Sequence, residues 1–430
     1  MLDRRQVLSL APAALIARGG NHGAASSRAE VAELATHAGT PEAIADDEDY
    51  WTVIQRAFPI ERSLIDLNNG NCSPCPNVVL DAWVQGMREA EGSPSYTMRR
   101  VLEPRRHVAH AGLADIFGVS EDEIALVPNA SFGLEALQLG FDLKPGAELL
   151  TTDQDYPHMR AAFRQREARE GMVCRTIEAP KPLNDPAELV RRFEAAITER
   201  TGLILCCHMV NLNGQILPVA DIVALGARHG IPVIVDGAHG FAHDPAMQKD
   251  LGCEFYSTSL HKWLQAPIGT GMLYIKKERI EEVWPLMTAD ERLTKQMSKF
   301  EQRGTRDVAA ELAVAEAVDF HRAVGADRKA ARMVWMRERW SKRFQGDERF
   351  IMRTDLTPGR AFGIATFTIE GIEDGALQRH MWRKHRIHTT VVGEEEGRGV
   401  RVSPGIQTTR ASLDIFGDAI EKVLCHGLPA

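Results

Sequence analysis

A regular alternation of short apolar runs with amphipathic helical patterns, between residues 124 and 275, constrains the fold most. The runs at 203–210 and 232–235 are nearly continuously apolar, as is typical of strands buried on both faces. The segment 185–199 instead repeats apolar residues at helical spacing. Strands that alternate with helices predict a mostly parallel sheet covered by helices on both faces. We expect strands at 124–127, 148–152, 173–177, 203–210, 232–235 and 272–275, and helices at 131–139, 157 onward, 185–199 and 218–229.

After about residue 310 the pattern changes. Residues 309–324 and the segment through 344 have the apolar spacing of long helices, and 364–369 alternates as a half-exposed strand does. Further strands are expected at 387–392 and 400–402, and a closing helix at 412–424. This pattern indicates a smaller α+β domain. The expected organisation is a signal at 1–25, a spacer at 26–50, an N-terminal segment near the site at 51–75, a large domain at 76–310 and a small domain at 311–430.

The charge and composition exclude several classes of partner. The chain has 51 Lys and Arg against 59 Asp and Glu, a formal net charge of −8, which argues against nucleic-acid binding. Aromatic residues are only 6% of the chain, so stacking platforms for single strands are not expected either. No stretch reaches the roughly 18 uninterrupted apolar residues of a membrane helix. We therefore expect no stable membrane anchor.

The N-terminus carries a targeting pattern. Arg4 and Arg5 precede a short apolar region at 8–17, and this arrangement resembles a bacterial twin-arginine signal. The apolar region is too short to span a bilayer. We expect export of the folded protein to the periplasm. The alternative is a cytoplasmic protein whose N-terminus happens to hold two arginines.

Polar segments follow most of the buried apolar runs. Ligands of open α/β sheets bind beyond the carboxyl ends of the strands, so these segments are expected to form one site. They are residues 129–131, 153–158, 211–214, 236–239 and 257–262.

A carboxylate and a lysine in these segments fit pyridoxal phosphate (PLP) chemistry. Asp236 ends the apolar run 233–235, and a buried carboxylate there is costly unless a cation or a metal pairs with it. Lys262 follows 26 residues later (262 − 236). A lysine amine can form a Schiff base with an aldehyde, and an aspartate can stabilise a protonated pyridine nitrogen. By itself the pair also fits a capping aspartate and a surface lysine.

The motifs around this pair resemble the class V aminotransferase family of fold-type I PLP enzymes. Residues 235–239 and 259–262 carry the resemblance, and residues 261–271 are most similar to the isopenicillin N epimerase-like branch. The resemblance covers most of residues 60–425. It implies an α/β fold-type I PLP transferase fold, whose large domain has a mostly parallel seven-stranded-type sheet covered by helices and whose smaller C-terminal domain is α+β. It also implies pyridoxal 5′-phosphate as cofactor, no metal, and a homodimer.

The resemblance implies a role for each matching residue. Lys262 is expected to bind the cofactor and to move the α-proton of the substrate, while Asp236 pairs with the pyridine nitrogen. His239 is expected near the phenolic oxygen of the cofactor. Tyr156 is expected to stack on the ring, although taken singly it also fits an ordinary half-buried tyrosine.

Other matches concern the phosphate and the substrate. Asn211 is expected near the cofactor and the substrate carboxylate, and Arg401 is expected to bind that carboxylate. Taken singly, Arg401 also fits a surface arginine on a strand. Asn129 stands where the family commonly has glycine or threonine. The phosphate pocket is expected to comprise the helix N-terminus at Ala130 and Ser131, the side chains of Ser259 and His261, and Thr305 acting across the dimer interface.

The resemblance implies an enzyme that acts on a small-molecule amine, an amino acid or a peptide-like amine. An aminotransferase or an epimerase is expected. The alternatives are a C–S or other lyase, a periplasmic siderophore-tailoring enzyme, and a PLP-fold binding module that is not an enzyme. The presence of Lys262 argues against a module without catalysis.

One departure from the family bears on the reaction. The stretch 388–397 has no cysteine, whereas desulfurases need a thiolate there to accept sulfur. We therefore predict no desulfurase activity by that mechanism. Cys72 and Cys75 have C-x-x-C spacing, which we interpret as turn chemistry and not as a metal or redox site. Substrate specificity is expected in the N-terminal segment and in loops at 93–104 and 265–305.

Overall fold

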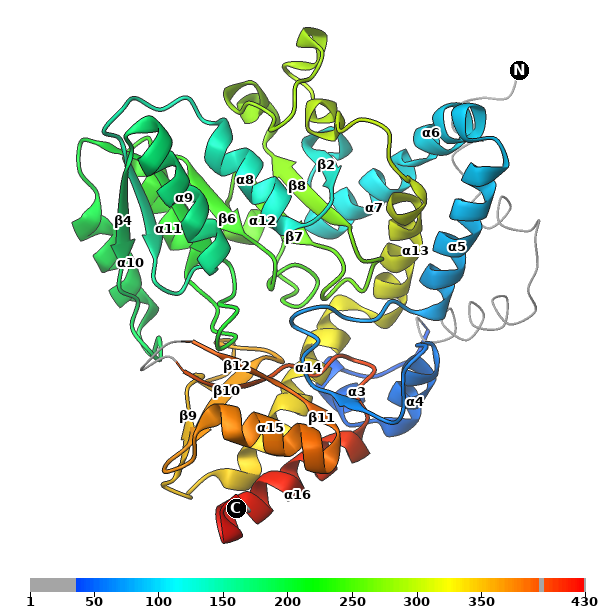
Figure 1. Ribbon diagram of the computed structural model, residues 1–430, viewed down its shortest axis with the longest axis vertical. Helices are drawn as coiled ribbons and strands as arrows, with labels where there is room; N and C mark the ends of the chain where they lie inside the picture. Colours follow the sequence, from blue (N-terminus) through cyan, green and yellow to red (C-terminus); the bar gives the residue numbers. More distant parts are fainter. Residues whose placement is uncertain (1–35, 394–397, 429–430) are drawn as a thin grey trace.

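A seven-stranded sheet forms the centre of the large domain (Figure 1). The structure, a computed structural model, describes residues 36–393 and 398–428 of the chain. The sheet order is β2-β8-β7-β6-β5-β3-β4, and its pairs are parallel except where β8 meets β7 and β2. The predicted mostly parallel α/β architecture is therefore confirmed. The strands are β2 (Ile124–Val127), β3 (Glu148–Thr152), β4 (Val173–Ile177), β5 (Thr201–Cys207), β6 (Val233–Asp236), β7 (Phe255–Ser259) and β8 (Gly271–Ile275).

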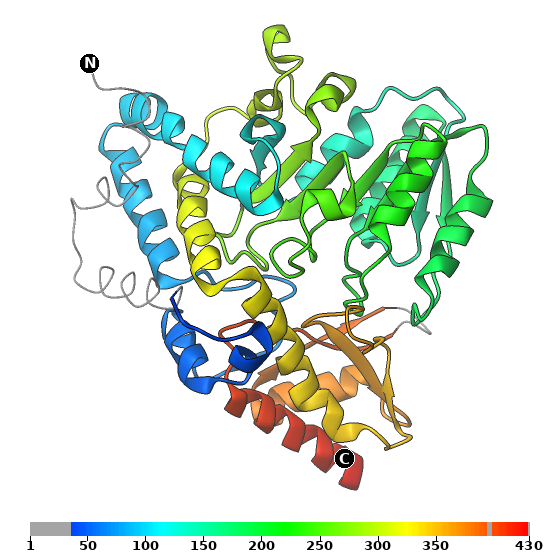
Figure 2. The same cartoon turned by 180° about the vertical axis from the view of Figure 1, so that it is seen from behind.

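Helices cover both faces of this sheet, as the apolar runs predict. Alternate residues of β6 enter two separate hydrophobic cores, with Val233 and Val235 in one and Ile234 in the other. Seen from behind, α13 (yellow) lies beside α5 (Figure 2). The main helices of this part are α5 (Asn77–Gly92), α7 (His107–Phe117), α8 (Ala130–Gly140), α9 (Pro157–Glu170), α10 (Pro186–Ala196), α11 (Val219–Arg228) and α13 (Ala309–Val324).

The small domain is a four-stranded antiparallel sheet packed with helices, which confirms the predicted α+β domain. The N-terminal helices α3 (Pro41–Ala45) and α4 (Glu48–Arg56) lie against it. Arg332 donates a hydrogen bond to the Ala45 carbonyl (2.8 Å) and pairs with Glu48 (2.6 Å). The elements of the domain are β9 (Phe350–Met352), β10 (Ala365–Ile369), β12 (Thr390–Val392), β13 (Gly399–Val402), α14 (Ala326–Ser341), α15 (Asp374–His385) and α16 (Arg410–His426).

Several elements differ from the sequence-based prediction. Strand β7 was not predicted, because its serine and threonine side chains make a buried segment appear polar. Ser257 and Thr258 donate hydrogen bonds to the carbonyls of Met272 and Gly237, which satisfies these hydroxyls inside the fold. The single strand expected at 387–392 is two strands, because β11 (Ile387–His388) pairs with β1 (Ile65–Asp66) while β12 joins the small sheet. Strand β9 and helix α15 were also not predicted.

The expected domain limits can be located on these elements. Residue 310, the expected boundary, lies in α13, and this helix packs along α5 and α7 of the large domain. The second half of the expected spacer contains α3 and the start of α4. The twin arginines, Arg4 and Arg5, lie outside the described residues. Within the described ranges, no helix has both the length and the apolar character needed to cross a membrane.

Candidate active site

A cavity of about 210 Å³ lies where the carboxyl ends of β5, β6 and β7 meet. It gathers nine of the residues predicted for the site from segments that are far apart in the sequence. These are Ala130, Ser131, Tyr156, Asn211, Asp236, His239, Ser259, His261 and Lys262. The polar segments that follow the strands therefore form one site, as their position in an open α/β sheet predicts.

Asp236 is one of the residues that line this cavity. It is the last residue of β6, it is buried, and its Oδ1 accepts a hydrogen bond from the Ala238 N–H (2.9 Å). Burial raises the pKa of Asp236 to about 6. A carboxylate in this position is stabilised by a positively charged partner, and a protonated ring nitrogen provides one.

Lys262 reaches the same cavity from the loop after β7. Its Nζ lies 3.0 Å from His239 Nε2. Burial lowers the pKa of Lys262 to about 8, the charge of Asp236 acts in the opposite direction, and the charge of Arg401 lowers the pKa further. One pH unit below this pKa about a tenth of the amine is uncharged, a far larger share than for an ordinary lysine, and this form can attack an aldehyde.

His239 is neutral, because burial lowers its pKa well below the usual value. If Nε2 accepts a hydrogen bond from Lys262, the proton of the neutral ring is on Nδ1. This Nδ1 is buried and has no hydrogen-bond partner among the described residues. A ligand oxygen in the cavity would satisfy it, which fits the expected place of the cofactor's phenolic oxygen.

Tyr156 also lines the cavity, and 45% of its surface is exposed. It is the N-cap residue of α9, in the turn after β3. Asp155, which was not singled out from the sequence, fastens this turn to the sheet. Its Oδ1 accepts from the Cys207 N–H (2.7 Å), and its Oδ2 accepts from the Thr152 N–H (2.7 Å). The signal for Asp155 was its position in the polar turn three residues after a buried strand.

The N-terminus of α8 forms one end of the cavity. The Ala130 N–H donates to Ser259 Oγ (3.0 Å), while Asn129 caps the helix by accepting from the Phe132 N–H (2.9 Å). Asn129 therefore has a capping function here. At Gly271 a Cβ atom would lie 2.7 Å from Asn129 Cα, so glycine is required for this close approach. Backbone N–H groups at a helix N-terminus suit the phosphate of PLP.

Arg401 comes from β13 of the small domain and approaches the cavity from outside its lining. It is buried, and it donates hydrogen bonds to the Asn211 carbonyl (2.7 Å) and to Asn68 Oδ1 (2.9 Å). Burial lowers the pKa of Arg401 to about 10, so the guanidinium is charged at neutral pH. Within the described part of the chain, no carboxylate forms an ion pair with it. Its charge is therefore available to a substrate carboxylate. Asn68, which accepts a hydrogen bond from this guanidinium, was not predicted from the sequence.

Thr305 is a predicted site residue that does not line this cavity. It is exposed, it does not line the cavity of its own chain, and its Oγ1 accepts from Arg99 (3.2 Å). The loop that holds it is anchored by Arg303 and Arg306, which both pair with Glu311 (2.7 and 3.1 Å). The structure of one chain thus fixes this loop without bringing Thr305 to the cofactor cavity.

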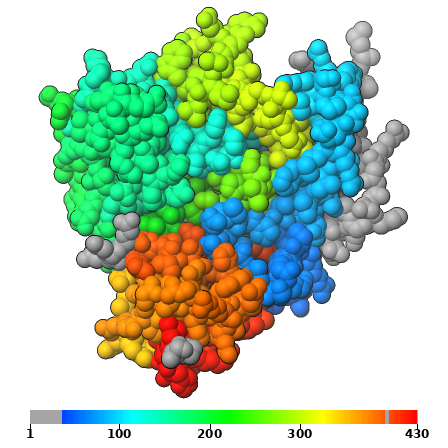
Figure 3. Space-filling model, in the orientation of Figure 1, coloured from blue at the N-terminus to red at the C-terminus, as the bar shows by residue number. Residues whose placement is uncertain are grey.

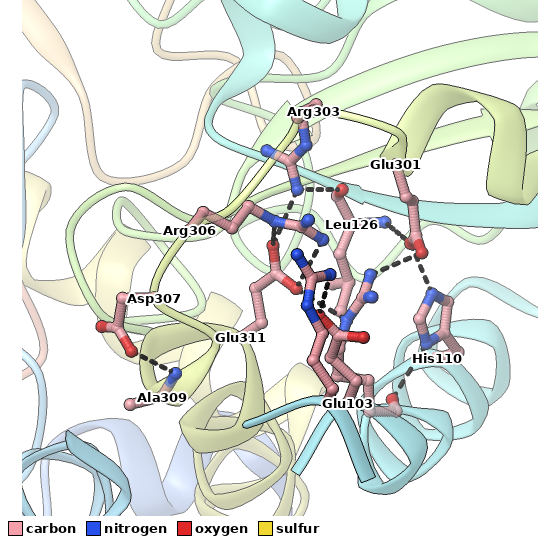
Figure 4. A network of polar contacts seen from close by, with 11 residues as sticks. Glu103, His110, Leu126, Glu301, Arg303, Arg306, Asp307, Ala309 and Glu311 are labelled. Atoms are coloured by element: carbon pink, nitrogen blue, oxygen red, sulfur yellow. Dashed lines mark hydrogen bonds and ion pairs between the residues drawn. The ribbon is translucent and has the colours of Figure 1, made fainter. Parts of the chain in front are cut away.

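The anchor of this loop is part of a larger buried network (Figure 4). Arg106 pairs with both Glu301 and Glu311, and His110 pairs with Glu301 (2.7 Å). Burial by itself would raise the pKa of Glu301, but His110 and Arg106 outweigh it and lower this pKa to about 2. The same contact with Glu301 outweighs burial at His110 and raises the pKa of that imidazole.

Cys72 is exposed and lines the cavity beside Lys262. The neighbouring Ser73 N–H donates to the His261 carbonyl (3.0 Å), which ties the N-terminal segment to the lysine loop. All seven cysteines lie in the described part of the chain, and each is a free thiol. The place of Cys72 in the lining could not be read from its C-x-x-C spacing.

Comparisons with known proteins agree with this geometry. The family model described as aminotransferase class-V matches residues 67–419. Isopenicillin N epimerase of Amycolatopsis lactamdurans is 28% identical in an alignment of length 392 that covers 87% of this chain and 98% of that protein. Hercynylcysteine sulfoxide lyase of Schizosaccharomyces pombe is 21% identical over 66% of this chain and 75% of that protein. The apo structure of cysteine desulfurase from Thermococcus onnurineus NA1 has a TM-score of 0.77 at 19% identity, covering 89% of this chain and 98% of that one, and it shows the same fold.

Proposed function

The chain belongs to the aminotransferase class-V family and uses pyridoxal 5′-phosphate, and from this premise we propose that it is an amino-acid epimerase. Transamination is the related outcome, because both reactions begin when the α-proton leaves the substrate. The main support is that Lys262, Asp236 and His239 line one cavity. Arg401 lies near them, and no carboxylate of the described residues pairs with its charge.

Each side chain of this group has a task in the proposed reaction. Bound PLP supplies an electron sink for the electrons left at Cα. Arg401 binds the substrate α-carboxylate and orients Cα, while Asp236 keeps a positive charge on the ring nitrogen stable. Lys262 takes the α-proton, for which an amine with a pKa near 8 is well matched.

Epimerisation is favoured because two side chains that can carry a proton, Lys262 and Tyr156, line the cavity from different strands. Lys262 follows β7 and Tyr156 follows β3, on opposite sides of β6 and β5 in the sheet. Three strand spacings of about 4.8 Å separate β7 from β3. We infer that the proton leaves toward Lys262 and returns from Tyr156, which requires the two side chains to face opposite faces of the bound Cα. The similarity to an isopenicillin N epimerase over nearly the whole chain also supports this proposal.

The reaction is tested by product analysis in deuterated water. We expect the opposite enantiomer of an L-amino acid to form with solvent deuterium at Cα. Lys262→Ala should lower kcat by about 10²–10⁴-fold, and Tyr156→Phe should reduce epimerisation while exchange of the α-proton continues. A 2-oxo acid as the main product would indicate transamination instead. Full activity of Lys262→Ala would contradict the proposed mechanism.

A C–S lyase is the second candidate. It is favoured by the similarity to a hercynylcysteine sulfoxide lyase and by the absence of cysteine from residues 388–397, because elimination needs no protein thiol to accept sulfur. Incubation with L-cysteine separates the candidates: a lyase releases sulfide and pyruvate, whereas an epimerase yields D-cysteine. The same assay tests for a siderophore-tailoring enzyme when a peptide precursor replaces cysteine.

We also propose that the protein is a homodimer in which Thr305 serves the cavity of the partner subunit. The support is the resemblance in the loop at 303–306, which is anchored by buried ion pairs but lies away from the cavity of its own chain. Sedimentation should give a dimer. Thr305→Ala should weaken PLP binding, and a monomer with full activity would overturn this part of the proposal.

Export to the periplasm is proposed on the basis of Arg4 and Arg5. Fractionation of bacterial cells that express the full chain should recover it from the periplasm. Replacement of both arginines by lysine should retain the protein in the cytoplasm. Recovery of the unaltered chain from the cytoplasm alone would show that the pattern is not a working signal.

A further inference from the structure

A buried group of residues connects the lysine loop to the small domain, and none of its members lines the cofactor cavity. It comprises His243, Trp263, Lys329 and Gly363, here called the buried brace. His243 and Trp263 belong to the large domain, whereas Lys329 lies on α14 and Gly363 precedes β10. The three side chains are only 1%, 2% and 3% exposed. Figure 3 shows the small domain (orange) against the large domain (green), and the buried brace joins these two parts inside the molecule.

Lys329 holds the backbone next to Lys262. Its Nζ donates a hydrogen bond to the carbonyl of Trp263, the residue that follows Lys262. Among the described residues no carboxylate forms an ion pair with Lys329, and burial lowers its pKa to about 7. Its titratable neighbours, His243 and His321, are neutral, because burial lowers the pKa of each to about 3. A buried amine without an opposite charge destabilises a fold, and such groups are typical of functional positions.

His243 holds the backbone of His239. Its Nε2 accepts a hydrogen bond from the Gly363 N–H (3.0 Å), so the proton of the neutral ring is on Nδ1. This Nδ1 donates to the His239 carbonyl (3.2 Å). The His243 ring also stacks on Trp263, with 3.8 Å between the ring centroids. His243 therefore contacts both the segment that carries His239 and the segment that carries Lys262.

The contact at Gly363 also leads to Arg401. Gly363 lies three residues before Thr366 of β10, and Thr366 pairs with Arg401 of β13 in the small sheet. In the proposed reaction Arg401 binds the substrate carboxylate and Lys262 takes the α-proton. The buried brace therefore connects the strand pair that carries the substrate-binding group to the loop that carries the base.

We propose that Lys329 and His243 are positioning residues that hold the Lys262 amine in place beside His239. The proposal rests on the proposed function, in which Lys262 carries the cofactor and takes the α-proton. Each positioning residue acts through one backbone carbonyl, that of Trp263 for Lys329 and that of His239 for His243. When either carbonyl loses its donor, the amine shifts and water reaches it. A displacement of about 1 Å can lower the rate of a reaction about 100-fold.

Cofactor capture tests the position of the Lys262 amine without any substrate. Burial is the main cause of the low pKa of Lys262, and the charges of Asp236, Arg401 and Cys72, which also act on it, stay in place when Lys329 is replaced. Lys329→Met keeps the length of the side chain but removes the amine. Water should then reach Lys262, and the pH at which PLP capture is half-maximal should rise above the value near 8. Stopped-flow absorbance measures this midpoint.

Arg166→Met is the matched control for this variant. Arg166 is also a buried cation, and it donates hydrogen bonds to the carbonyls of Gln138 (2.9 Å) and Phe141 (3.0 Å), which do not line the cofactor cavity. Its replacement should leave the midpoint of PLP capture unchanged. An equal rise of the midpoint in Arg166→Met and Lys329→Met would show a general loosening of the fold and would overturn the proposal.

Kinetics separate positioning from substrate binding. In deuterated water, Lys329→Met should lower kcat for exchange of the α-proton of L-alanine by about 10- to 100-fold. KM should not change, because Arg401 still binds the carboxylate. A raised KM with an unchanged kcat would contradict the positioning role.

Two variants of His243 separate its hydrogen bond from its stacked ring. In His243→Asn the amide nitrogen takes the place of Nδ1 and can donate to the His239 carbonyl, whereas His243→Phe keeps a ring over Trp263 and has no donor. His243→Phe should raise the midpoint of PLP capture and lower kcat, as Lys329→Met does, and His243→Asn should be affected less. Equal losses in the two variants would overturn the role of the hydrogen bond. The same pair decides the proposal if urea denaturation shows that Lys329→Met does not fold.

Failure of the inference is distinguishable from failure of the proposed function. Borohydride reduction of the holoenzyme followed by peptide mapping should place the cofactor label on Lys262. If the label lies elsewhere, the proposed function fails and the inference fails with it. If the label is on Lys262 while Lys329→Met and His243→Phe keep the midpoint and the kcat of the unaltered enzyme, the proposed function stands and the positioning role of the buried brace is wrong.

Discussion

Lys262 is the residue whose chemistry depends most on its surroundings. Burial lowers its pKa to about 8, while Asp236 and Arg401 act on it in opposite directions. The lysine combines with an aldehyde only in its uncharged form. Burial therefore sets most of the shift in the pH at which the cofactor is captured, and the two neighbouring charges adjust it.

This balance predicts the pH dependence of cofactor binding. The rate at which apoenzyme binds PLP should rise with pH and reach half its maximum near pH 8. Arg401→Gln removes a positive charge that disfavours protonated Lys262, so the midpoint should move to higher pH. Asp236→Asn removes a negative charge that favours it, so the midpoint should move to lower pH. Stopped-flow absorbance measures both shifts; shifts in the same direction would contradict the assignment of charges.

At the scale of elements, buried ion pairs fix the loop that carries Thr305. Glu311 on α13 pairs with Arg106, Arg303 and Arg306, all at low exposure. Removing one partner of such a group leaves uncompensated buried charge. The loop at 303–306 thus depends on α13 and on the segment before α7 for its position.

Glu311→Gln should therefore lower the free energy of unfolding by about 3–5 kcal/mol. The control is Glu89→Gln, which breaks the exposed pair with Arg105 (3.3 Å) and should cost at most about 1 kcal/mol. Urea denaturation of both variants measures the difference. Equal effects would show that the buried network does not hold this part of the fold.

His110 gives the same network a pH dependence. Its pKa is raised in the folded protein, so its contribution to stability is complete below the unfolded pKa of about 6.5 and is lost as pH rises through the folded pKa. Urea denaturation should give a lower free energy of unfolding at pH 9 than at pH 6, and His110→Gln should reduce this difference. His158→Gln, at an exposed pair with Glu135, should leave the difference unchanged.

At the scale of the whole molecule, the site exists only where three parts of the chain meet. Arg401 comes from the small domain, Asn68 from the N-terminal segment, and Asn211 from the loop after β5. The orientation of the guanidinium is thus set by contacts between residues more than a hundred positions apart.

Asn68→Ala should remove one of the hydrogen bonds that orient the Arg401 guanidinium. A hydrogen bond to a charged group contributes about 1.5–3 kcal/mol, so KM for the amino acid should rise by roughly tenfold or more. The absorbance of bound PLP should not change, since Asn68 does not line the cofactor cavity. Steady-state kinetics of Asn68→Ala measures the change in KM, and Asn184→Ala, at an exposed position, is the control. An unchanged KM in Asn68→Ala would contradict the role of Asn68 in orienting Arg401.

Local pattern was enough to predict much of the fold and many of the candidate site residues. Apolar periodicity located six of the seven strands of the large sheet, and the motifs around Asp236 and Lys262 indicated the cofactor. These features are predictable because the spacing of apolar residues indicates burial, and short motifs of polar residues indicate the chemistry of a site. Tertiary structure alone decided that β7 is a buried strand, that Asn68 orients Arg401, and that Gln265 donates a hydrogen bond to Gln407. Such pairings join distant segments, and their energy comes from contacts that no local pattern records.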